Sequence, residues 1–360
     1  MLPGKTLREL AIEIERQDNE KKDFLIDTRS MVMDADETGA SITITNDKTG
    51  DSVILGVNDI AHTQLGQSLG IPKAYYDKML AQNPALLSEN VNAWLNNEPK
   101  TKMVRTLDNN MRAFLSDRYL RIDNRPIAET VLPILQEMNV KFASTEITDS
   151  RMYIKVVNER LTREVRPGDY VQSGLIITNS EVGMGTVTIQ PLLYRLVCTN
   201  GMIVNDMRSS VTKRKHVGRR NLINEEDYVL YASDTLQADF NALTLKMRDT
   251  FQSALNEVHF NDLIDNMRVA TEASIETNHI PEMVQLAASD FGYTKKEGEG
   301  ILDHLIRGGD LTMYGFANAV TRYAQDVHSY DRSTELEAIG YNILTMPRNA
   351  WKRLQEADAA

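Results

Sequence analysis

The spacing of apolar positions changes along the chain, and the N-terminal third mixes helical and strand-like periods. Apolar residues at helical spacing predict a short amphipathic helix over residues 7–14. Residues 24–33 and 40–45 have the pattern of two strands, with acidic turn residues between them. From residue 58 to residue 97 the pattern is helical, with interruptions near Pro72 and Pro84. We therefore expect a strand pair followed by several helices.

The middle third predicts mainly strands. The pattern indicates a strand and turn over 112–121, a helix over 126–138, and strands over 140–147, 151–157, 170–179 and 186–198. In the last strand Val187 and Ile189 alternate with polar residues, but the phase shifts after Pro191, which indicates a bulge or a sheet edge. Asn200 and Gly201 predict a tight turn. We expect a mostly antiparallel sheet with one packed helix.

The last third is helical in pattern. One apolar stripe at helical spacing consists of Leu236, Phe240, Leu243, Met247, Phe251 and Leu255. A helix of that length packs along the whole body or against a partner's copy. The fold class predicted is α+β, with a central mostly antiparallel sheet, a packed helix and an all-helical C-terminal region. We expect three regions: an N-terminal α+β region (1–105), a β-rich core (106–222) and a helical region (223–360).

Composition narrows the class of protein. A chain of 360 residues predicts two to three structural units. Its single cysteine, Cys198, excludes an internal disulfide and a multi-cysteine zinc site, and its apolar surroundings predict a buried small hydrophobe. No apolar stretch approaches the roughly 18 residues that span a bilayer, and the residues after Met1 lack a signal-peptide core. We expect no membrane contact and a place in the cytoplasm.

Catalytic patterns are missing from the sequence. There is no phosphate-binding loop ending in Gly-Lys-Ser/Thr, and no pair of histidines spaced to hold zinc on a helix. Glu146, Asp149 and Lys155 lie on neighbouring predicted strands and keep a magnesium-dependent nuclease open as an alternative, although Tyr153 stands where a carboxylate is expected. The sequence therefore predicts a protein that is not an enzyme and that needs no cofactor or metal.

Positive charge is concentrated in one stretch, residues 208–220, called here the basic segment. Its six permanent cations are Arg208, Lys213, Arg214, Lys215, Arg219 and Arg220, and it contains no carboxylate. The net charge of the chain is −11, so this segregation favours a local phosphate-binding patch. The alternative is a solvated basic loop that pairs with some of the 51 acidic residues.

Three stretches resemble a known family. They are residues 115–123 (Leu-Ser-Asp-Arg-Tyr-Leu-Arg-Ile-Asp), 194–202 (Tyr-Arg-Leu-Val-Cys-Thr-Asn-Gly-Met) and 311–323 (Leu-Thr-Met-Tyr-Gly-Phe-Ala-Asn-Ala-Val-Thr-Arg-Tyr). In this order they resemble the phage/plasmid-like family catalogued as domain of unknown function 932. Arg322 stands where that pattern has an acid. The strands and helix before the basic segment are also similar in architecture to single-strand annealing proteins of the RecT, Redβ and Erf types.

The family has no established activity, so this resemblance implies a phage or plasmid origin, and with it the cytoplasm of a host cell. The similarity to annealing proteins, together with the basic segment, leads us to expect a phage-encoded homo-oligomer that binds and anneals single-stranded DNA in recombination or replication. Region 106–222 is then the nucleic-acid-binding core. The phosphate groove is expected to be lined by the basic segment together with Arg118, Arg121, Lys155 and Arg195. Base stacking is expected on Tyr119, Tyr153 or Tyr194. The alternative hypothesis is a host-modulating or assembly protein that acts through protein–protein contacts of its helical region.

Overall fold

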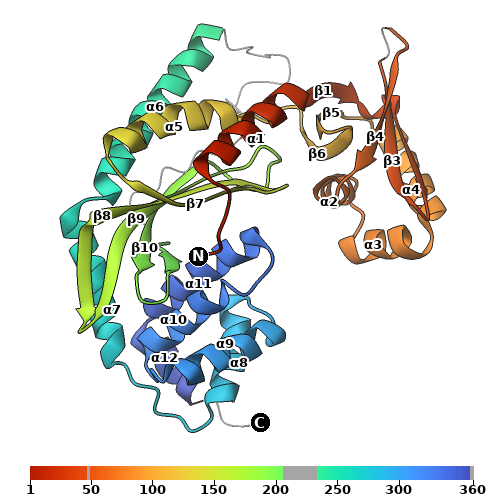
Figure 1. Cartoon of the computed structure of the whole chain (residues 1–360). Helices are drawn as coiled ribbons and strands as arrows, with labels where there is room; N and C mark the ends of the chain where they lie inside the picture. Colours follow the sequence, from red (N-terminus) through yellow and green to blue (C-terminus); the bar gives the residue numbers. More distant parts are fainter. Residues whose placement is uncertain (47–48, 206–232, 357–360) are drawn as a thin grey trace.

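The computed structural model describes residues 1–46, 49–205 and 233–356, which form two β-sheets and twelve α-helices. Figure 1 shows one lobe built on a six-stranded sheet and a larger lobe built on a five-stranded sheet. Helix α1 (Leu7–Glu20) runs into strand β1 between the two lobes. Helices dominate the chain from α6 onward. The predicted α+β class is therefore confirmed.

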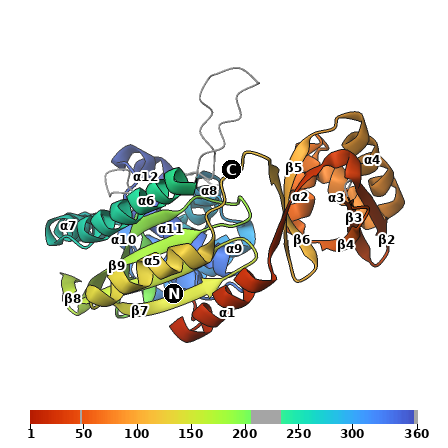
Figure 2. The same cartoon turned by 90° about the horizontal axis from the view of Figure 1, so that it is seen from above.

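The six-stranded sheet has the order β1-β5-β6-β4-β3-β2. Its strands are β1 (Lys22–Asp27), β2 (Met31–Asp36), β3 (Gly39–Thr45), β4 (Ser52–Val57), β5 (Thr101–Leu107) and β6 (Asn110–Ser116). All its pairs are antiparallel except β4 with β6. Helices α2 (Asp59–Ser68), α3 (Lys73–Gln82) and α4 (Pro84–Asn97) share one apolar core with this sheet. Figure 2 shows these helices beside the sheet from above.

The prediction of one continuous strand over residues 24–33 is wrong, because a 3₁₀ turn, Thr28–Ser30, separates strand β1 from strand β2. Asp27 caps this turn by accepting a hydrogen bond from the Arg29 backbone, and the buried Thr28 hydroxyl donates to the Leu95 carbonyl. Residues on both sides of the corner pack into the same core, so the apolar pattern runs through it without a break. Strands β4 and β5 were not predicted.

The five-stranded sheet has the order β11-β10-β9-β8-β7 and is antiparallel throughout. Its strands are β7 (Lys141–Ile147), β8 (Met152–Arg166), β9 (Asp169–Asn179), β10 (Thr188–Arg195) and β11 (Asn200–Ile203). The register between β9 and β10 does not shift at Pro191, so a bulge there is wrong. Strand β11 pairs with β10 only from Leu192 onward, and Pro191 therefore lies beyond the end of that ladder.

The turn predicted at Asn200 and Gly201 is also wrong. The chain turns over residues 196–199, where Thr199 takes a left-handed backbone conformation with φ of 51°. Asn200 and Gly201 are buried and begin β11. Cys198 lies in the turn, is only half-buried, and accepts a hydrogen bond from Arg195 at 3.4 Å. The expectation of a buried cysteine in a strand is therefore corrected.

Helices cover both faces of the five-stranded sheet (Figures 1 and 2). On one face α1, α5 (Asn124–Glu137) and α6 (Ser233–Ala254) share a core with β8, β9 and β10, so three helices pack where one was expected. On the other face α11 (Tyr330–Leu344) packs on Tyr153, Ile176 and Leu192. The remaining helices are α7 (Glu257–Glu272), α8 (Ile280–Phe291), α9 (Lys295–Gly308), α10 (Met313–Tyr323) and α12 (Arg348–Gln355).

The apolar stripe of the long predicted helix is partly visible. Met247 and Phe251 in the last part of α6, and Leu255 just after it, are buried against the sheet, so this part of the helix packs along the body of the protein. The side chains of Leu236, Phe240 and Leu243 lie outside the described residues. Among the helices that the structure describes, none combines the length and the apolar character needed to cross a bilayer.

Candidate functional site

The basic segment, with Arg208, Lys213, Arg214, Lys215, Arg219 and Arg220, lies outside the described residues. Its point of attachment is described, because β11 ends at Ile203 and Asn205 is the last described residue before it. Asn205 lines two separate hollows, one on the five-stranded sheet and one among the C-terminal helices. We call these the polar groove and the helical cleft.

The polar groove has a volume of about 260 Å³ and lies between the sheet face of β8–β10 and helix α11. Hydroxyl and amide side chains line it together with apolar Ile176, Ile203 and Ala338. The Thr178 and Thr188 hydroxyls share a hydrogen bond of 2.6 Å across β9 and β10, and Gln190 donates to Asn205 at 2.6 Å. Such groups can donate to or accept from phosphate oxygens and base edges, because hydroxyls and amides serve both roles.

One wall of the polar groove is organised by Asp331 at the start of α11. Its carboxylate accepts hydrogen bonds from Thr148 (2.9 Å), Ser150 (2.6 Å) and Tyr153 (2.7 Å). Burial and the hydrogen bond to Asp331 raise the pKa of Tyr153, so its hydroxyl stays protonated as the donor. Tyr153 is 1% exposed, and its ring is not available for base stacking in this arrangement.

The other two tyrosines predicted to stack differ in their surroundings. Tyr119 is half-buried and donates to the Ser180 carbonyl at 3.1 Å, while burial raises the pKa of its hydroxyl. Tyr194 on β10 is half-exposed and does not line the polar groove.

The helical cleft has a volume of about 960 Å³ and is bounded by α7, α10, α11 and α12. Buried Met313, Tyr341 and Trp351 form its apolar floor. Glu272 and Arg348 are among the charged residues at its lining, so the cleft combines an apolar base with a mixed polar rim. It falls in the size range of sites that hold small molecules or side chains of a partner.

The four predicted phosphate contacts outside the basic segment do not line the polar groove. Arg118 is exposed beyond the end of β6, and Arg121, 56% exposed, pairs with Asp23 at 3.1 Å. Lys155 is fully buried and pairs with Glu337 at 2.6 Å. Arg195 is mostly buried and donates two hydrogen bonds to the Asp169 carboxylate, at 2.6 and 2.7 Å. Lys155 and Arg195 are therefore committed to internal carboxylates.

A cation missed by the sequence reasoning, Arg151, does line the polar groove. It precedes β8 and donates to the Met184 carbonyl in the loop between β9 and β10. No local pattern distinguishes Arg151 from other surface arginines, because its place depends on the pairing of three strands.

The second and third family-like stretches meet in the fold. Arg195 of β10 and Tyr314 of α10 both bind Asp169, and the Arg195 guanidinium lies 5.4 Å from the centre of the Tyr314 ring. Asn200 donates to the Thr321 hydroxyl, which joins β11 to the same helix. These contacts hold the helical layer on the sheet, so Arg195, Asn200, Tyr314 and Thr321 of the two stretches have a packing role.

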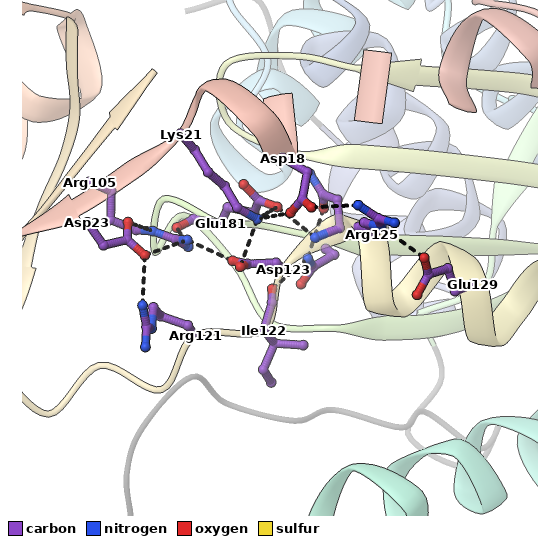
Figure 3. Close-up of polar contacts among 12 residues, drawn as sticks. Asp18, Lys21, Asp23, Arg105, Arg121, Ile122, Asp123, Arg125, Glu129 and Glu181 are labelled. Atoms are coloured by element: carbon purple, nitrogen blue, oxygen red, sulfur yellow. Dashed lines mark hydrogen bonds and ion pairs between the residues drawn. The ribbon is translucent and has the colours of Figure 1, made fainter. Parts of the chain in front are cut away.

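The first family-like stretch ends in a cluster of charges at the contact between the two sheets (Figure 3). We call Lys21, Asp23, Arg105, Asp123 and Glu181 the junction cluster. Arg105 of β5 is fully buried and donates to Asp23 (2.8 Å), Asp123 (2.7 Å) and the Glu181 carbonyl (2.8 Å). Lys21, at the end of α1, pairs with Asp123 at 2.8 Å. The cluster links α1, β1 and β5 to the start of α5 and the loop after β9.

The charges of the junction cluster compensate one another. Burial alone raises the pKa of Asp123, but Arg105 and Lys21 outweigh it, and the net shift is downward. Glu181 is 5% exposed, and its carboxylate accepts from Arg112 at 2.5 Å and from the Asn124 backbone at 2.6 Å. The cluster therefore fixes the two sheets relative to each other and leaves no free carboxylate pair for acid–base chemistry among these residues.

Among the described residues, no three histidine, cysteine or acidic side chains are grouped so as to hold a metal ion. Of the residues behind the nuclease alternative, Glu146 pairs with Lys5 and Lys155 pairs with Glu337. The lysine that would steady a leaving phosphate thus has its ammonium group buried against a carboxylate.

One of the comparisons with known proteins gives a match. A family model described as Domain of unknown function (DUF932) matches residues 113–351. The chain belongs to this family. No curated protein and no solved structure matches the chain. The DUF932 match begins in β6 and ends in α12, so it includes the five-stranded sheet, the polar groove, the basic segment and all of the helical cleft except Gln355. Strands β1–β5 and helices α1–α4 precede it.

Proposed function

We propose that this protein binds and anneals single-stranded DNA without catalysis, in recombination or replication of a phage genome. The observation that carries the proposal is the concentration of six cations and no carboxylate in residues 208–220 of a chain with net charge −11. Phosphate contacts by lysine and arginine supply most of the affinity of sequence-independent DNA binding. Fixed cations so close together in an acidic chain offer a nucleic-acid backbone a local site within a Debye length.

The polar groove, which lies next to the attachment point of the basic segment, also supports the proposal. The basic segment begins three residues after Asn205, which lines the groove floor beside Gln190. A strand held by the basic segment would find hydroxyl and amide groups and Arg151 next to the attachment point, and it would have to pass the carboxylates of Asp331 and Glu335 on the α11 side. Arg118 and Arg121 are exposed enough to contact more distant phosphates, whereas Lys155 and Arg195 have no place in the proposed interface. Annealing is proposed to need a homo-oligomer, as in the proteins of similar architecture.

The experiment is a titration of a fluorescent 30-nucleotide oligothymidine with the full chain, followed by anisotropy between 50 and 400 mM salt. Six engaged phosphates give a log–log slope near −4, from about −0.7 for each contact on a single strand. Duplex DNA of the same length is the comparison ligand, and mass photometry of the same samples reports the oligomer. A flat salt dependence, or no binding at 50 mM salt, contradicts the proposal.

A second candidate function is favoured by the helical cleft. Its 960 Å³ volume and its buried floor of Met313, Tyr341 and Trp351 suit contacts with a host or assembly partner. Alanine replacement of Lys213, Arg214, Lys215, Arg219 and Arg220 separates the two candidates. The replacement abolishes function that depends on DNA and leaves partner binding through the cleft intact.

A further inference from the structure

Trp94 in α4 is the more exposed of the two tryptophans in the chain. It is 41% exposed, whereas Trp351 in the floor of the helical cleft is 6% exposed. Tryptophan is highly buried on average, because its indole ring carries a large apolar area. The Trp94 indole N–H also has no hydrogen-bond partner in the described part of the chain. A flat aromatic surface is thus left open to solvent in the N-terminal lobe.

A shallow hollow lies beside Trp94, between α4, the end of α2 and strand β5. Ser68, Lys100, Lys102 and Phe114 also line it. Its volume is about 10 Å³, which is about the space of one water molecule. Protein partners usually insert anchoring side chains into pockets of an interface, and this hollow has no room for one. A ligand here lies flat against the exposed ring and the side chains around it.

Lys102 places a positive charge without a counter-charge in this hollow. It pairs in register with Ile26 and is half-buried on the face of the sheet that α4 covers. Its ammonium group lies 5.3 Å from the centre of the Phe114 ring and makes no hydrogen bond or ion pair with any described residue. Burial and the neighbouring Lys100 lower the pKa of Lys102, and Asp117 opposes them only in part. An anion from outside the chain would stabilise a cation held in this way.

The other charges near the hollow leave it open to an anion. Glu98 lies 3.4 Å from Lys100, but both side chains are more than half exposed, so this pair contributes little. Lys102 is also opposite Ser116 in the register of β5 with β6, and the exposed Arg118 follows two residues later. Arg118 is one of the two cations assigned above to more distant phosphates. The hollow therefore lies at the same end of β6 as a cation of the proposed DNA interface.

We propose that Trp94 and Lys102 hold one nucleotide of a bound single strand, an inference that rests on the proposed function. The base stacks on the exposed indole face, and the adjacent phosphate pairs with Lys102. Lys100 and the Ser68 hydroxyl, which makes no hydrogen bond within the described residues, line the same hollow beside that phosphate. Every base has a flat π-face, so this contact is independent of sequence, as annealing requires. The site lies before residue 113, outside the family match.

Tryptophan fluorescence tests the stacking directly. In Trp351→Phe, Trp94 is the only tryptophan, and the oligothymidine described above is expected to quench its emission in step with binding measured by anisotropy. An abasic strand of the same length has phosphates but no bases, so it is expected to bind without quenching. Free thymidine monophosphate at the same nucleotide concentration is expected to quench far less, because only a strand is also held by the basic segment. If Trp351→Phe does not fold, the difference in emission between the wild type and Trp94→Phe replaces it.

Affinity measurements test each partner of the nucleotide. Trp94→Ala is expected to weaken oligothymidine binding about fivefold or more through loss of one stacked base. Tyr75→Ala, at an exposed aromatic of α3 outside the hollow, is the control and should not change affinity. Lys102→Gln is expected to flatten the log–log salt slope by about 0.7, the share of one phosphate contact. Lys78→Gln, at an exposed position of α3, should leave the slope unchanged.

The outcomes separate this inference from the proposed function. Oligothymidine binding with unchanged Trp94 emission overturns the inference and leaves the proposed function standing. Equal quenching by the abasic strand or by free thymidine monophosphate does the same, as does unchanged binding in both Trp94→Ala and Lys102→Gln. Absence of any DNA binding by the wild-type chain overturns both.

Discussion

Lys155 of β8 and Glu337 of α11 form an ion pair of 2.6 Å in which neither side chain is exposed to solvent. Thr334 accepts a second hydrogen bond from the ammonium group at 3.1 Å, and the Tyr330 ring lies 4.7 Å from it. The pair joins the five-stranded sheet to helix α11, which covers one of its faces. It also explains why a lysine predicted to contact phosphate does not reach the surface.

Removal of one partner of this pair is expected to cost more than removal of both. Lys155→Met leaves the Glu337 carboxylate buried without a counter-charge and is expected to lower the free energy of unfolding by about 3 kcal/mol. Lys155→Met combined with Glu337→Met is expected to lie within about 1 kcal/mol of the wild type. Urea unfolding of the two variants and the wild type measures the difference. Equal losses in the single and double variants contradict this account.

The junction cluster makes stability fall in acid. Because the pKa of Asp123 is lowered in the folded chain, its carboxylate stabilises the fold above the unfolded pKa of about 3.9. This contribution is lost as the pH falls from about 4 through the lower folded pKa. Asp123→Asn is expected to be less stable at pH 7 and to lose less stability between pH 5 and pH 2 than the wild type. Glu15→Gln, at an exposed position on α1, is the control and should follow the wild-type curve.

Two glycines are expected to respond to alanine in opposite directions. A Cβ at Gly315 would lie 1.8 Å from the Asp310 carbonyl oxygen, so Gly315→Ala is expected to destabilise the protein by about 2 kcal/mol or more. Gly308 ends α9 with nothing within 4 Å of an added Cβ. Gly308→Ala is expected to change stability by less than about 1 kcal/mol, in the stabilising direction. Thermal unfolding compares the two, and a neutral Gly315→Ala would contradict the packing described for the third family-like stretch.

DNA binding is expected to depend on where charge is removed. Lys213→Ala with Arg214→Ala removes two cations of the basic segment, which should flatten the log–log salt slope by about 1.4. Lys295→Ala with Lys296→Ala removes the same charge from exposed positions at the start of α9 and should leave the slope unchanged. The measurement is the anisotropy titration described above. Equal effects of the two pairs would indicate steering by net charge rather than contact.

The polar groove gives a test on a described residue. Thr186 lines it and lies in the loop between β9 and β10, outside any strand. Thr186→Lys is expected to tighten oligothymidine binding several-fold and Thr186→Glu to weaken it, because each changes the charge beside the path proposed for the strand. Two variants with indistinguishable affinity would place the DNA elsewhere.

The sequence was informative where local pattern and burial coincide. Strand β9 and helix α5 follow their apolar spacing closely, and the antiparallel central sheet was predicted from it. The corner at Thr28 was missed because the side chain that stabilises it binds Leu95, 67 residues away. Propensity over a short window contains no information about such a contact.

The candidate site was predictable only in part. The basic segment is evident from composition, because its charge is local in sequence. Lys155 and Arg195 looked equally suitable as strand cations, yet Lys155 meets Glu337 of α11 and Arg195 meets Asp169 of the neighbouring strand β9. Arg105, Asp123 and Glu181 gave no signal, since their association depends on how two sheets meet.

The junction cluster also bears on where this chain can be cut. The family match starts at Ala113, inside β6, whose partner β5 precedes the match. A fragment that begins at that residue would lack β5, the partner strand of β6. It would also lack Arg105 and Lys21, the two cations that pair with Asp123. Expression of the family-matched part alone is therefore a poor guide to this protein. A usable shorter form has to keep the cations that reach across from the N-terminal lobe.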